Sequence, residues 1–117
     1  MGLFGRISGK EVDEFARQLA RRLAERFPAE LEKDRTKHLS EHRLTKLLEE
    51  ICEEAAHFKT EKKLGIYKKA RLGNTFRWEL DELGYTEKFI ETATEALIVY
   101  ISRKAADTTP ADTETGN

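Results

Sequence analysis

Residues 8–27 read SGKEVDEFARQLARRLAERF, and their pattern decides the fold class. Ser8 and Glu11 have the spacing of a capping box, in which each side chain bonds a backbone N–H group of the first helical turn. Apolar residues then recur at helical spacing, namely Val12, Phe15, Ala16, Leu19, Ala20, Leu23 and Phe27. We therefore expect an amphipathic helix over residues 8–27. Pro28 ends this helix and can start one further turn.

Two later segments repeat this pattern. Ser40 is a candidate N-cap for a helix over residues 40–63, and Thr86 is a candidate N-cap for a helix over residues 86–104. Antiparallel packing of the three apolar stripes predicts one shared core. Its expected members are Phe15, Leu19, Leu23, Leu48, Ile51, Phe58, Phe89, Leu97 and Tyr100.

The composition agrees with a small all-α domain. The chain has 117 residues, of which 38% are hydrophobic and 37% are charged. This length provides one core, and this balance is typical of a thin helical bundle with solvated outer faces. We expect one helical domain over residues 1–104. Residues 105–117 contain acidic but no basic side chains and no large apolar residue, so we expect a disordered acidic tail.

The segment 64–85 allows two interpretations. The first is an insert of one or two short helices, at 66–72 and 75–83, in which the pairs Leu72-Gly73 and Leu83-Gly84 end each helix. The second is a β-hairpin over residues 66–80 with a turn at Gly73-Asn74. Pairing the strands of this hairpin leaves neither face apolar, which favours the helices. A third pair, Leu64-Gly65, is the expected C-terminal end of the helix over residues 40–63.

The same part of the chain concentrates positive charge. Residues 59–77 contain seven basic side chains and one acidic side chain, interleaved with aromatic residues. Cationic groups neutralise phosphates and planar rings stack on exposed bases, so contact with DNA or RNA is one hypothesis. The candidate contact residues are Lys59, Lys62, Lys63, Tyr67, Lys68, Lys69, Arg71, Arg77 and Trp78. The alternative is that the lysines solvate a turn while the aromatic rings pack into the bundle.

The last helix has a second apolar side. Residues 96–101 are apolar without interruption, so Ile98 and Val99 point away from the main stripe. We predict self-association, as a homodimer, through Ile98, Val99 and Ile101. The alternative is that the segment 64–85 covers this side within one chain, with Phe76 and Trp78 as its lid.

No arrangement of residues predicts catalysis. His38 and His42 match an H-x-x-E-H pattern, but capping by Ser40 would place His38 outside the helix, so we expect no metal site and no cofactor. Cys52 is the only cysteine, which excludes an internal disulfide and fits a cytoplasmic protein without a membrane segment. The predicted function is a small non-enzymatic protein–protein interaction module. The alternative is a nucleic-acid-binding accessory protein, and no small-molecule ligand is inferred.

Overall fold

A computed structural model describes residues 7–34 and 40–103 as an all-α fold, which confirms the predicted class. The helices are α1 (Gly9–Arg26), α2 (Ala29–Lys33), α3 (Glu41–Glu61), α4 (Ile66–Glu82) and α5 (Glu87–Ser102). These two ranges contain no strand. The predicted tail over residues 105–117 lies outside the described residues.

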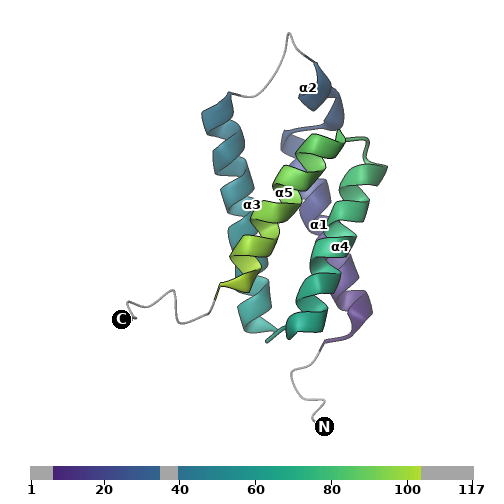
Figure 1. The fold of residues 1–117 in the computed structure, drawn as a ribbon, viewed down its shortest axis with the longest axis vertical. Helices are drawn as coiled ribbons and strands as arrows, with labels where there is room; N and C mark the ends of the chain where they lie inside the picture. Colours follow the sequence, from purple (N-terminus) through teal and green to yellow (C-terminus); the bar gives the residue numbers. More distant parts are fainter. Residues whose placement is uncertain (1–6, 35–39, 104–117) are drawn as a thin grey trace.

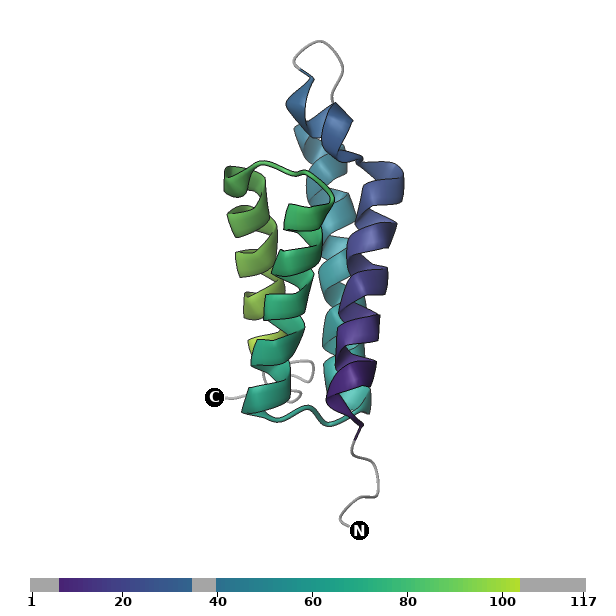
Figure 2. The same cartoon turned by 90° about the vertical axis from the view of Figure 1, so that its right-hand side faces the viewer.

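The four long helices stand side by side as a bundle, and the short α2 lies at one end (Figure 1). α1 packs against α4 and α3, and α5 packs against the same two helices. α1 and α4 run in one direction, whereas α3 and α5 run in the other (Figure 2). α4 packs against α1 and α5 rather than against α3, so the turn after α3 leads to the helix diagonally across the bundle, and α4 and α5 lie next to each other.

The predicted helix starts are confirmed. The Ser8 hydroxyl accepts a bond of 3.2 Å from the Glu11 amide, and the Ser8 amide donates one of 3.1 Å to the Glu11 carboxylate. The hydroxyl groups of Ser40 and Thr86 accept amide bonds at the starts of α3 and α5. Pro28 separates α1 from α2. Local sequence signals are sufficient at these positions because a cap involves only residues within one turn.

The favoured helical interpretation of residues 64–85 is confirmed, but its division into short helices needs correction, and the alternative β-hairpin does not form. Most of this segment is the single 17-residue helix α4. Its buried residues are Leu72, Gly73, Phe76 and Leu80, which share one side of the helix. A Cβ atom at Gly73 would lie 2.6 Å from Cδ1 of Ile98 on α5. Gly73 therefore lets α4 and α5 approach closely and does not end a helix.

The other two Leu-Gly pairs have different roles. Gly84 follows α4 with φ +96°, as a glycine at a helix end does. After α3, however, the residue with positive φ is Lys63, at 55°. Gly65 is the N-cap of α4, so its predicted role as the end of α3 is wrong.

The core combines residues from all the helices. Leu19, Leu23, Ile51, Phe89 and Leu97 are buried as predicted. Four other predicted core residues are only partly buried at the edge of this core: Phe15, Leu48, Phe58 and Tyr100. Two of them, Phe15 and Phe58, stack with ring centroids 3.8 Å apart and join α1 to α3. The contribution of α4 to the core is what the expected three-helix arrangement lacked.

Candidate interaction surfaces

Exposed apolar side chains gather on one side of the bundle. Six large apolar residues are exposed in the described part of the chain, and all lie on α4, on α5 or directly after α4. They are Ile66, Tyr67, Trp78, Leu83, Ile98 and Val99. α1, α2 and α3 expose none. Ile66 and Tyr67 lie at the turn between α3 and α4, whereas Trp78, Ile98 and Val99 lie between α4 and α5. A group of exposed apolar side chains such as these last three points to an interaction surface.

Two cavities lie in the seam between α4 and α5. One has a volume of about 390 Å³ and is lined by Asn74, Arg77, Trp78, Asp81, Glu87 and Ile90. The other has a volume of about 460 Å³ and is lined by Arg77, Glu91, Thr94, Glu95, Ile98 and Val99. Arg77 lines both and so connects Trp78 with the apolar pair on α5. We call the surface formed by Arg77, Trp78, Glu91, Glu95, Ile98 and Val99 the α4–α5 face.

The three residues predicted to mediate self-association differ in how far they are exposed to solvent. Ile101 is 1% exposed and belongs to the core, so its predicted place in an interface needs correction. Val99 is 56% exposed. Ile98 is less exposed, at 38%, because its side chain lies against Gly73 of α4. The alternative lid is also only partly present, because Phe76 is buried whereas Trp78 is 62% exposed. Val99 and Trp78 are therefore the most accessible apolar residues of the α4–α5 face.

The predicted nucleic-acid contact residues do not form one surface. Lys59 is buried and its Nζ donates to the Arg103 carbonyl oxygen. Arg71 donates from Nε and Nη2 to the two carboxylate oxygens of Asp13 on α1, at 2.9 and 2.8 Å. These bonds lower the pKa of Asp13 to about 2 and raise that of Arg71. Arg71 is thus paired with Asp13 and Lys59 is covered, which argues against both as nucleic-acid contact residues.

Part of the basic set does come together at the turn between α3 and α4. Lys62, Lys63, Tyr67 and Lys68 line a cavity of about 420 Å³ with Ile7, Leu64, Gly65 and Ile66. Tyr67 is exposed there, and Lys69 is half-buried. Arg77 and Trp78 lie about three turns further along α4, on the α4–α5 face. The positive block of the sequence therefore becomes a smaller group of three lysines and one tyrosine.

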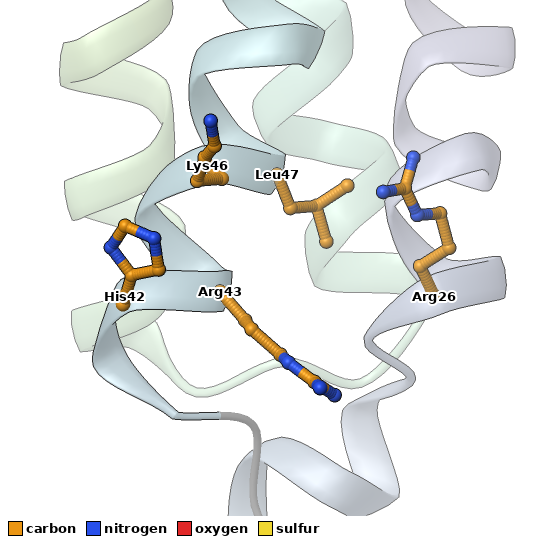
Figure 3. A pocket seen from close by; sticks show the side chains of 5 residues that line it. All are labelled: Arg26, His42, Arg43, Lys46 and Leu47. Carbon is orange, nitrogen blue, oxygen red and sulfur yellow. The ribbon is translucent and has the colours of Figure 1, made fainter.

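The sequence interpretation missed a second basic surface. Arg26 from the end of α1 and His42, Arg43, Lys46 and Leu47 from the start of α3 line a cavity of about 510 Å³ (Figure 3). The basic residues are sparse in the sequence and are separated by the α1–α3 connection. A count of charge along the chain cannot detect such a group, because two helices must first be placed side by side.

Two kinds of reactive group, a set of metal ligands and a nucleophilic thiol, can be checked in the described ranges. No three His, Cys, Asp or Glu side chains gather there in a way that could hold a metal ion, and His38 lies outside those ranges. His42 lies among cationic side chains. Cys52 is buried as expected, and burial raises the pKa of its thiol to about 11. A thiol with so high a pKa is a poor nucleophile at neutral pH.

None of the helices in the described part combines the length and apolar character that a membrane span requires. No family model, curated protein or solved structure matches the chain.

Proposed function

We propose that this domain is a non-enzymatic interaction module that forms a homodimer through the α4–α5 face. The observation that carries the proposal is the confinement of all exposed large apolar residues of the described part to α4, α5 and the turn after α4. Removing apolar surface from water stabilises a complex by roughly 25 cal/mol for each Å² buried. A partner that covers Trp78, Val99 and the exposed part of Ile98 would recover this energy.

Charge complementarity favours a second copy as that partner. Arg77 lies between Trp78 and the apolar pair on α5, while Glu91 and Glu95 flank the same cavity. Within the described residues these three charged side chains form no salt bridge. A two-fold axis presents the same patch twice, so Arg77 of one copy can face the glutamates of the other. Opposite charges at the edge of the interface would fix the orientation of the two copies around the apolar side chains at its centre.

The test is Val99→Glu, with Thr45→Glu as the matched control. Val99 is an exposed residue of the α4–α5 face, whereas Thr45 is an exposed residue of α3 that does not belong to this face. We expect the wild type and Thr45→Glu to form dimers in light scattering coupled to size-exclusion chromatography. Val99→Glu should raise the dimer dissociation constant at least about tenfold, because it places an uncompensated carboxylate in the interface.

Circular dichroism should show that both variants remain helical. A wild-type protein that stays monomeric at about 1 mM would contradict the proposal. Equal weakening by Thr45→Glu and Val99→Glu would also contradict it, since the effect would then reflect added charge and not the position.

A second candidate function is nucleic-acid binding at the turn between α3 and α4. The specific observation is that three lysines and the exposed Tyr67 line one cavity there. Lysine ammonium groups neutralise backbone phosphates, and the phenol ring offers a stacking surface for a base. This site is smaller than the sequence predicts, so we propose contact with a short single strand.

The triple variant Lys62→Glu, Lys63→Glu, Lys68→Glu tests this candidate. At about 50 mM salt it should bind a single-stranded oligonucleotide at least about tenfold more weakly than the wild type, whose affinity should fall steeply with added salt. The control makes the same change of charge at exposed lysines elsewhere, through Lys10→Glu, Lys33→Glu and Lys88→Glu. No binding by the wild type, or equal loss in the control, would refute nucleic-acid contact at this turn.

A further inference from the structure

The cavity between α1 and α3 has an unusual pattern of charge. Along the contact of these two helices, Arg22 pairs with Glu54, and Arg26 pairs with Glu50 at 2.9 Å. One turn further toward the start of α3, the position after Glu54 and Glu50 is occupied by Lys46. The pairing of basic residues of α1 with acidic residues of α3 therefore ends at this point, where α1 also ends.

Within the described ranges, the cationic side chains of α3 beyond these two ion pairs are not paired with a carboxylate. Arg43 and Lys46 form no salt bridge or side-chain hydrogen bond within residues 7–34 and 40–103. Among the described residues, no carboxylate lines the cavity. Arg26 keeps donors available after its bond to Glu50, because a guanidinium has five N–H groups. The first turns of α3 also carry the positive end of the helix dipole.

The geometry favours an extended anion over a single small one. Leu47 and Arg43 project from α3 toward the side on which Arg26 lies, while Lys46 and His42 occupy the neighbouring face of α3 (Figure 3). The cationic side chains that line the cavity therefore extend in different directions and do not converge on one point (Figure 3). Its volume of about 510 Å³ falls within the range of small-molecule sites. Leu47, which is 2% exposed, provides a rigid apolar floor.

We propose that this cavity binds the phosphate groups of a small polyphosphate, either inorganic or attached to a nucleoside. Arginine binds phosphate oxygens in pairs through its planar fork, and lysine adds a compact charge. Several linked phosphates offer a separate anionic group to each of Arg26, Arg43 and Lys46, which all line the cavity. The inference does not depend on the dimer, because the cavity and the α4–α5 face are formed by different helices.

Calorimetric titration with inorganic tripolyphosphate tests the proposal. The variant Arg43→Gln/Lys46→Gln removes two charges from the cavity but keeps long polar side chains on α3. The control, Arg21→Gln/Lys88→Gln, removes the same charge from exposed positions on α1 and α5 that do not line the cavity. We expect one-to-one binding to the wild type and the control, and binding at least about tenfold weaker in the cavity variant. Titration with a nucleoside triphosphate then shows whether the base adds affinity.

A thermal readout distinguishes a site from screening by salt. Tripolyphosphate should raise the unfolding midpoint of the wild type more than sodium sulfate does at equal ionic strength, and this difference should disappear in the cavity variant. No binding to the wild type at about 1 mM tripolyphosphate would overturn the proposal. Equal weakening in the control would overturn it as well. Binding of an oligonucleotide that is lost in the cavity variant, without binding of tripolyphosphate, would assign the cavity to nucleic acid and overturn the proposed ligand.

Discussion

Replacing Phe76 with alanine is expected to lower the free energy of unfolding by about 3–5 kcal/mol. Phe76 is fully buried near the middle of α4, on the side that also contains Leu72, Gly73 and Leu80. Removing its ring takes away apolar contacts and leaves a cavity where α4 meets the rest of the bundle. Because α4 packs against both α1 and α5, the bundle cannot close this cavity by moving one helix alone.

Chemical denaturation measures this loss, and Trp78→Ala provides the control. Trp78 lies on the same helix and is also aromatic, but it is 62% exposed. Its replacement should cost less than about 1 kcal/mol at protein concentrations low enough to avoid association. Similar costs for the two variants would show that α4 is not docked through Phe76. The comparison therefore tests the helix that the sequence interpretation divided.

The sequence predicts α1, α3 and α5 well because their signals are local. Ser8, Ser40 and Thr86 each cap the helix that follows them, and each stripe is continuous over several turns. α4 was predicted poorly because Gly73 has a role that depends on Ile98, which is 25 residues away in the sequence. A glycine that permits close packing and a glycine that ends a helix look the same in one sequence.

The candidate surfaces show the same limit. The exposure of Val99 follows from helical periodicity, and the structure places it on the outside as expected. The positive charge of residues 59–77 did not predict a single surface, because Arg71 turns toward Asp13 of α1 and Lys59 is buried against the end of α5. Conversely, Arg26 and Arg43 become neighbours only when α1 and α3 pack together. Charge along a chain predicts a binding surface only where no partner within the fold neutralises it.

Asp13 is expected to make the stability of the bundle depend on pH. Arg71 donates two bonds to its carboxylate, and the hydroxyl of Thr75 donates a third, at 2.8 Å. The bonds from Arg71 are the main reason that the pKa of Asp13 falls from 3.8 to about 2 in the folded chain. The unfolded chain therefore takes up this proton at a higher pH than the folded chain does. The stabilisation is fully present above about pH 4 and is lost as the pH falls toward 2.

The variant Asp13→Asn isolates this contribution, because asparagine keeps the shape of the side chain and removes its charge. At neutral pH we expect the variant to be less stable than the wild type by about 1–2 kcal/mol, a range that allows for partial solvent screening. The difference should shrink between about pH 4 and pH 2, as the wild-type carboxyl becomes protonated. Asp81→Asn, at an exposed position of α4, should show no such convergence.

A difference in stability between Asp13→Asn and the wild type that stays constant down to pH 2 would contradict this expectation. It would mean that the amide disturbs packing and that the ion pair between α1 and α4 contributes little. Convergence would instead show that the partly buried contact between Asp13 of α1 and Arg71 of α4 is electrostatic, and this pairing engages Arg71 within the bundle.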